Sequence, residues 1–369
     1  MKTRYKLVDE FFLKAFGPTE DLSLNSVAID QNAKNALDQD VQFKLFTAKN
    51  TEENIKTAIE ISHKVKASLK NLDALEAELG IEKATQSFSS DIQAVGGLFT
   101  EDRDTEMGAN IRISGNKILY DSKGSDYRID ARSAQLEAGK RAVLVAVNET
   151  AVHAYESWID LVRYKRINAI YRDGLSKGEK ILQQIESVSV SGLSDKKGLL
   201  SATRDLLNLQ NNFIATQALE KTAEENFYNV FTGSNIIDVI ESPAVNSSHV
   251  VPSNTELMLG RFALEEKYLL QEALTNQIMA ISASKKPTVA FRASVDAPAE
   301  DTLDDSTAHA GLMLSYVLND GGSLDYRIEQ LKAQLEVAEN QIRDLEKTFK
   351  GIMVSSGNSF VHETESQVI

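Results

Sequence analysis

The sequence predicts a mainly α-helical protein with a smaller β component, in which long antiparallel helices are joined to two β-hairpins. The first observation is proline usage: only five prolines occur in 369 residues, and none lies between Pro18 and Pro243. Because proline interrupts helices, this interval can hold very long ones. The second observation is that two regions alternate in hydrophobicity instead of following the helical period. The third is a segment that recurs 199 residues later, which predicts a duplicated unit.

Four helical regions are expected from the three-and-four spacing of apolar residues. An early helix covers about 51–85, a very long one about 124–190, and a later one about 254–284. A break at 191–194 separates the long helix from another over about 195–231, which predicts an antiparallel hairpin. The long helix would span about 100 Å, too long for a compact core, so its apolar stripe is expected to pack as a coiled coil. That stripe consists of Ala151, Ala154, Tyr155, Trp158, Val162, Ile167, Ile170, Ile181 and Ile185.

Two β-hairpins are expected where the helical period breaks. The first joins strands at 91–99 and 109–120, and the second joins strands at 288–295 and 311–318. In the last of these, Leu312, Leu314, Tyr316 and Leu318 alternate with other residues, as in a strand with one apolar face.

An internal repeat organises these elements. When 119–137 is placed on 318–336 without a gap, ten of nineteen positions are identical, whereas chance at ~1 in 16 per position gives about one. Ile369 is the equivalent of Ile170, so the second repeat stops within its long helix. We therefore expect a chain that is truncated at its C-terminus.

The repeat predicts the domain organisation. Residues 1–50 stay unassigned, and 51–233 form the first repeat, with its β-hairpin at 91–120. Residues 234–253 form a connector, and 254–369 form an incomplete second repeat with its β-hairpin at 288–318.

Composition excludes several classes of function. The net charge of -14 argues against nucleic acid as a partner, because phosphate binding needs a basic surface. The chain has no cysteine, so disulfides and thiolate sites are absent. The longest aliphatic run covers only 142–147, far short of the ~20 residues that a membrane helix needs. The amino terminus does not read as a signal peptide, so either the chain is cytoplasmic or its start has been lost or processed.

The motifs and their order resemble the TolC-like outer-membrane channels of efflux and type I secretion systems. The segments Leu119-Tyr-Asp-Ser-Lys-Gly and Leu318-Asn-Asp-Gly-Gly are similar to that family's L-F-D-G-G junction between strand and helix. The segment 191–200 is similar to the family's hairpin tip, A-G-x-x-S-x-x-D-x-L, but has Gly198 where the aspartate usually stands. The resemblance covers about 51–350.

The resemblance implies a homotrimer in the cell outer membrane. Each protomer would give four strands to one transmembrane β-barrel of twelve strands, in contact with lipid, and its helices to a hollow periplasmic tube. The implied function is that of a passive export duct of a type I secretion system. It would dock to a periplasmic adaptor protein and, through it, to an inner-membrane ABC or proton-driven transporter. The alternatives are the outer-membrane component of a tripartite drug efflux pump and, in another class, a periplasmic coiled-coil adaptor or interaction protein.

Three groups of residues are candidates for functional sites. The resemblance implies a partner-docking tip at Ser191, Gly192, Leu193 and Ser194, although a plain turn with a helix cap explains the same residues. The strand–helix junctions contain Asp121, Gly124, Asp320, Gly321 and Gly322, where the two aspartates are expected to cap helices. Candidates for the membrane interface are Tyr127, Arg128, Tyr326 and Arg327, although helix packing explains them equally well.

No catalytic, cofactor-binding or metal-binding constellation is present, so we do not expect an enzyme. The five histidines at 63, 153, 249, 309 and 362 are scattered, and no pair has the spacing of a zinc site. The acidic loops at 101–106 and 300–305 lack the regular spacing of a Ca²⁺ loop and are expected to be solvated. Trp158 is expected to pack between helices.

Overall fold

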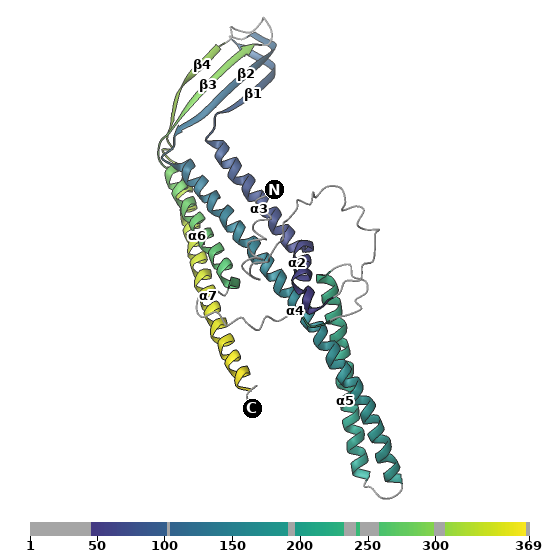
Figure 1. The fold of residues 1–369 in the computed structure, drawn as a ribbon. Helices are drawn as coiled ribbons and strands as arrows, with labels where there is room; N and C mark the ends of the chain where they lie inside the picture. The colour runs from purple at the N-terminus through teal and green to yellow at the C-terminus, as the bar shows by residue number, and fades with distance from the viewer. Residues whose placement is uncertain are drawn as a thin grey trace. The chain divides into compact units, whose positions relative to one another are not determined.

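The computed structural model describes residues 46–101, 104–190, 196–231, 241–243, 258–298 and 307–366. Its elements are η1 (Ala48–Asn50), α2 (Thr51–Ile61), α3 (His63–Thr85), β1 (Ser89–Glu101), β2 (Asp104–Tyr120), α4 (Gly124–Val190), α5 (Lys196–Val230), α6 (Met258–Ser284), β3 (Thr288–Pro298), β4 (Thr307–Ser315) and α7 (Ser323–Ser366) (Figure 1). The predicted class, mainly helical with a small antiparallel sheet, is confirmed.

The duplication is visible in the element boundaries. Three pairs of boundaries are each 199 residues apart: the ends of α3 and α6 at Thr85 and Ser284, the starts of β1 and β3 at Ser89 and Thr288, and the starts of α4 and α7 at Gly124 and Ser323. The repeat therefore extends from sequence identity to the placement of whole elements.

The chain divides into two compact units, and the division cuts through the helices α3 and α4. One unit contains Met1–Ala67 and Ala146–Val250, and the other contains Ser68–Val145 and Val251–Ile369. Each unit therefore takes residues from two separate stretches of sequence, and neither coincides with one of the two sequence repeats.

In the first unit α4 and α5 form an antiparallel hairpin (Figure 1). The buried Asn168 donates from Nδ2 to the carbonyl oxygen of Thr216 at 3.2 Å, and Lys165 pairs with Glu224 at 3.4 Å. Gly178 allows a close approach, because a Cβ there would lie 2.8 Å from the side chain of Leu206. The predicted coiled-coil packing of these two helices is confirmed.

An aromatic cluster forms the core of the first unit. Trp158 is fully buried and meets Phe46 edge to face with ring centroids 5.1 Å apart; Phe46 also packs on Phe227 at 4.8 Å. Trp158 Nε1 donates to the carbonyl oxygen of Glu241 at 2.8 Å, and the N–H of Glu241 donates to the carbonyl oxygen of Phe46. Trp158 is thus a packing residue, as predicted, and it also anchors the chain at Glu241.

In the second unit the two hairpins form one antiparallel sheet in the order β1-β2-β3-β4 (Figure 1). Strands β2 and β3 join the hairpins, with Ser114 opposite Ser294. The register within the first hairpin recurs in the second: Ser89 pairs with Asn116, and Thr288 pairs with Ser315, each residue shifted by 199 positions.

Helix pairs continue from this sheet within the same unit. Helices α3 and α4 are linked by Glu78 with Arg132 at 2.8 Å and by Glu82 with Arg128 at 2.6 Å. Helices α6 and α7 run antiparallel side by side (Figure 1), and the Tyr268 hydroxyl donates to Glu346 at 2.7 Å.

Four expectations from the sequence need correction. The first acidic loop is shorter than the expected 101–106, because β1 runs to Glu101 and β2 begins at Asp104. The helix expected over 51–85 is interrupted at Ser62, which has an extended ψ of 122° and whose Oγ accepts from the N–H of Val65, so it caps a second helix. Strand β4 ends at Ser315, which leaves Tyr316 and Leu318 outside the strand. In α4 the expected stripe is buried near Trp158, but Ile170 is 71% exposed.

Candidate functional site

The apolar face of the four-stranded sheet is the first part of the candidate site. Side chains alternate across a strand, and directly paired residues share a face. This face consists of Ile92, Ala94, Ala109, Ile111, Ile113, Val289, Phe291, Ala293, Val295, Ala297, Ala308, Ala310, Leu312 and Leu314, with Ser90, Gly96, Gly115 and Lys117 among them. Leu312 and Ile92 are 71% and 70% exposed, so the single chain does not cover the face.

The opposite face of the sheet is mainly polar. It carries Ser89, Asp91, Gln93, Asn110, Arg112, Ser114, Asn116, Arg292, Ser294, Asp296, Thr307, His309 and Ser315, with Val95, Ile118, Ala290 and Met313 as its larger apolar members. Arg112 pairs with Asp296 directly across from it, and Ser114 Oγ donates to Asp91 at 2.6 Å. These two contacts link β1 to β2 and β2 to β3 on this face.

Strands β1 and β4 are the ends of the sheet. In the part of the chain that the structure describes, each has a strand on one side only. The free N–H and C=O groups of such an edge can pair with a further strand. The sheet is therefore incomplete in the single chain, on its apolar face and along both edges.

The junction between β2 and α4 is tied to the preceding helix. Asp121 Oδ2 accepts from the N–H of the buried Ser125 at 2.6 Å, which caps α4 as predicted. Arg128 donates to Ser125 Oγ at 2.9 Å and pairs with Glu82 of α3. Gly124 is buried at this point, where a Cβ would lie 3.5 Å from Ala283.

The junction between β4 and α7 repeats the capping and is more open. Asp320 Oδ2 accepts from the N–H of Leu324 at 2.7 Å, and Oδ1 accepts from the N–H of Gly322 at 3.0 Å. Leu324 is the repeat equivalent of Ser125, so both aspartates cap their helices in the same way, as the sequence predicted.

Both junctions use two successive residues in the left-handed region. These are Ser122 and Lys123, with φ of 56° and 68°, and their equivalents Gly321 and Gly322, with φ of 67° and 83°. Glycine adopts this region freely, whereas other residues pay about 1–2 kcal/mol. The first junction therefore carries backbone strain that the second does not.

Exchanging the residue types at these equivalent positions should have opposite effects. We expect Lys123→Gly to raise the free energy of unfolding by about 1 kcal/mol and Gly322→Ala to lower it by about the same amount. Urea unfolding followed by circular dichroism measures both. Two changes of the same sign would contradict the conformational explanation.

The pKa of Asp320 is lowered below its ordinary value. The cause is the hydrogen bonds that its carboxylate accepts from Leu324 and Gly322, with a smaller attraction from Lys285. Because the pKa is lower in the folded state, the ionised carboxylate stabilises the fold above the unfolded pKa, and this contribution is lost as the pH falls through the folded pKa.

We therefore expect Asp320→Asn to be less stable than the native chain at neutral pH, and the difference to shrink as the pH falls below about 4. Urea unfolding at a series of pH values tests this. A stability difference that does not change with pH would contradict the role of the ionised carboxylate.

The four candidates for the membrane interface differ in their surroundings. Arg128 lies in the ion-pair network of the first junction, whereas Tyr326 is 71% exposed at the start of α7. Other exposed aromatic residues lie at the helix end of the sheet: Phe88, Tyr120 and Tyr316 are 56%, 58% and 55% exposed.

The proposed docking tip at Ser191, Gly192, Leu193 and Ser194 lies outside the described residues, as does most of the connector at 234–253. Among the described residues, no group of three or more His, Asp or Glu side chains is arranged to hold a metal ion. None of the described helices is both long and apolar enough to cross a lipid bilayer.

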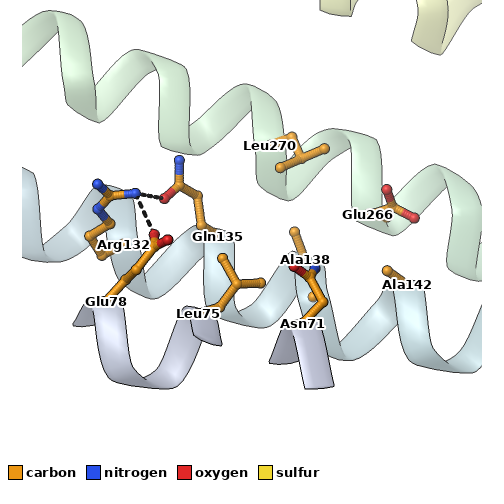
Figure 2. A pocket seen from close by; sticks show the side chains of 10 residues that line it. Asn71, Leu75, Glu78, Arg132, Gln135, Ala138, Ala142, Glu266 and Leu270 are labelled. Carbon is orange, nitrogen blue, oxygen red and sulfur yellow. Dashed lines mark hydrogen bonds and ion pairs between the residues drawn. The ribbon is translucent and has the colours of Figure 1, made fainter. Parts of the chain in front are cut away.

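A cavity of about 400 Å³ lies among α3, α4 and α6 (Figure 2). At its edge Arg132 donates to both Glu78 and Gln135 at 2.8 Å, as Figure 2 shows. Leu75 and Leu270 supply apolar lining. The arrangement is a gap between packed helices and carries no reactive group.

Comparisons with known proteins relate this geometry to a fold. No family model and no curated protein matches the chain. Among solved structures, the transmembrane-channel protein CusC covers 95% of the chain and 84% of its own length, with a TM-score of 0.74 and 13% identity. The outer membrane protein VceC of Vibrio cholerae covers 86% and 82%, with a TM-score of 0.74 and 15% identity. The CmeC outer membrane channel of Campylobacter jejuni covers 90% and 77%, with a TM-score of 0.69 and 12% identity.

The chain therefore has the fold of outer-membrane channel proteins. The similarity extends over nearly the whole chain in CusC, so it includes the sheet and the long helices together. The resemblance to TolC-like channels that the junction motifs indicated is confirmed at the level of the fold.

Proposed function

We propose that the chain is one subunit of a trimeric export duct in the outer membrane. Three copies would each contribute the four strands to one barrel of twelve strands, and their helices would form a hollow tube in the periplasm. The duct is passive and not an enzyme, and it needs no cofactor. Energy comes from a transporter in the inner membrane.

The four-stranded sheet is the observation that carries this proposal. Its two faces differ in polarity and both of its edges are open. Open edges cannot lie in lipid, because nothing there satisfies their hydrogen bonds. A closed barrel removes the edges and places the apolar face against lipid and the polar face against a water-filled lumen. The fold shared with CusC, VceC and CmeC supports the same conclusion.

Within this proposal we place type I secretion first and a tripartite drug efflux pump second. The segments 153–163 and 191–194 are more similar to the type I secretion members of the TolC-like channels than to the drug-efflux members. The tip would dock to a periplasmic adaptor protein, and the adaptor would connect the duct to an inner-membrane ABC or proton-driven transporter. The test is to express the chain in strains that lack their own outer-membrane duct. Restored secretion without restored drug resistance would support type I secretion, and the reverse result would favour the drug efflux pump.

Molar mass in solution tests the duct itself. Light scattering on the purified chain in mild detergent should give a particle of about three times 40.7 kDa, with aggregation in plain buffer because the apolar face is exposed. A monomer or dimer that is unaffected by detergent would overturn the proposal and favour a coiled-coil adaptor or interaction protein.

A further inference from the structure

We infer that β4 of one copy binds β1 of the next copy in one defined register, in which Met313 lies directly opposite Val95 of the next copy. The inference rests on the proposed trimeric barrel. It adds the residues that form the contact between subunits and a strand extension that occurs only in the assembly.

The two repeats share their geometry in detail. The first hairpin and the second have the same strand register, and both junctions have the same left-handed pair and the same capping bond. The contact from the preceding helix also recurs: Gln86 donates to Asp126 at 2.8 Å, and Lys285, its equivalent, pairs with Asp325. The repeats are therefore equivalent as three-dimensional units.

Equivalent units in a closed ring make equivalent contacts. Within the chain, repeat one meets repeat two through β2 and β3. Three copies in a closed barrel place six repeats around one axis, so repeat two must meet repeat one of the next copy. The pairing of β2 with β3 is therefore the template for the pairing of β4 with β1 of the next copy.

Shifting the template by 199 residues gives the register between copies. In the template, Ser114 lies opposite Ser294. The residue equivalent to Ser114 in the second repeat is Met313, and the residue equivalent to Ser294 in the first repeat is Val95. Met313 is therefore expected to lie opposite Val95 of the next copy. By the same shift, the pair of Asn116 with Arg292 becomes Ser315 with Gln93, and the pair of Gly115 with Ala293 becomes Leu314 with Ala94.

The derived register keeps the two faces of the sheet continuous. Leu314 and Ala94 both belong to the apolar face, and Ser315 and Gln93 both belong to the polar face. A slip of one residue would place apolar side chains on the polar face. The competing registers are therefore those that slip by two residues.

The derived register also explains why β4 is shorter than its equivalent. Strand β2 runs to Tyr120, whereas β4 stops at Ser315, four positions before the equivalent Asn319. In the template, Lys117 pairs with Phe291 and Ile118 pairs with Ala290. The same shift places Tyr316 opposite Ile92 of the next copy and Val317 opposite Asp91 of the next copy. In the single chain Tyr316 and Val317 are 55% and 51% exposed, and β1 has a strand on one side only.

The contact between copies differs from its template in charge. The ion pair of Arg112 with Asp296 becomes Gly311 opposite Gly97 of the next copy. Backbone hydrogen bonds must therefore hold the edges together at this level, because neither glycine has a side chain. The association should accordingly depend little on salt.

Disulfide cross-linking tests the register, and the absence of native cysteine gives a clean background. In the full chain carrying Met313→Cys and Val95→Cys, oxidation in detergent should produce covalent dimers and trimers on a non-reducing gel. Directly opposite residues are about 4.5–5.5 Å apart, which a disulfide spans. The matched control is the template pair itself, Ser114→Cys with Ser294→Cys, which should cross-link only within one chain.

Two further double variants distinguish the possible outcomes. Met313→Cys with Gln93→Cys, or with Gly97→Cys, is displaced by two residues and should give little covalent trimer, because diagonal neighbours lie about 7–8 Å apart. Trimers that cross-link through a displaced pair would overturn the register and leave the duct proposal intact. Absence of any trimer by light scattering would overturn the duct proposal itself.

Hydrogen exchange on the native chain provides a test without substitutions. Because successive N–H groups of a strand point to opposite sides, one of the two amides of Tyr316 and Val317 faces the next copy. That amide should exchange slowly in the detergent particle and quickly in monomer obtained by dilution into denaturing detergent. Fast exchange of both amides in a particle of trimeric mass would overturn the strand extension.

Discussion

A single charge at the centre of the apolar face is expected to abolish stable insertion of the sheet into lipid. Ile113 lies between Ile92 and Val295 on this face and is 52% exposed. In the proposed barrel Ile113→Lys faces the lipid near mid-depth, where a lysine costs about 2–4 kcal/mol. Since three copies carry the substitution, the destabilisation of the trimer is three times as large.

The matched control is Ser114→Lys, one residue further along the same strand on the polar face. This lysine enters the lumen beside Asp91 and should leave insertion nearly unchanged. The measurement is the fraction of folded protein in phospholipid vesicles as a function of urea concentration. Equal insertion of both variants would show that the apolar face is not in contact with lipid.

The second large effect is expected from Trp158→Ala in the core of the first unit. The indole is fully buried, and its loss leaves a cavity beside Phe46 and Phe227 and removes the donor to Glu241. Truncation of a buried tryptophan costs about 3–5 kcal/mol. We expect the urea midpoint of the helical signal to fall accordingly, with loss of order at Phe46 and Glu241.

Two controls separate packing from the hydrogen bond. Trp158→Phe keeps a ring but removes the N–H, so part of the loss should return, with about 1 kcal/mol remaining for the unsatisfied carbonyl. Ile170→Ala lies on the same helix at a position that is 71% exposed, and its effect should stay within about 0.5 kcal/mol. If Ile170→Ala destabilises the chain as much as Trp158→Ala, the cluster is not the core of the unit.

The strand–helix junctions show how far local sequence reaches. The capping by Asp121 and Asp320 was predicted from sequence, because a cap depends on residues only four positions apart. The ion pair of Arg128 with Glu82 was not predicted, because it depends on how α3 packs on α4. Its residue type and its place at the junction make Arg128 a candidate for the membrane interface, and the structure adds its contact between two helices.

The strands also show what the local sequence cannot predict, namely where a strand ends. The alternation of Leu312 and Leu314 identified the strand, yet Tyr316 and Leu318 continue the pattern beyond the point where β4 ends. Alternation records which residues suit a strand, whereas a strand forms only where a neighbour supplies hydrogen bonds. For the same reason the sequence predicted two hairpins without their union through β2 and β3.

The sequence by itself determined the long helices, the two hairpins, the duplication and the capped junctions, because each follows from periodicity or from residues close together along the chain. The tertiary structure alone decided the cluster around Trp158, the ion pairs between helices and the joining of the two hairpins through β2 and β3. These depend on contacts between residues far apart in sequence, whose formation is decided by packing and by which backbone groups find partners.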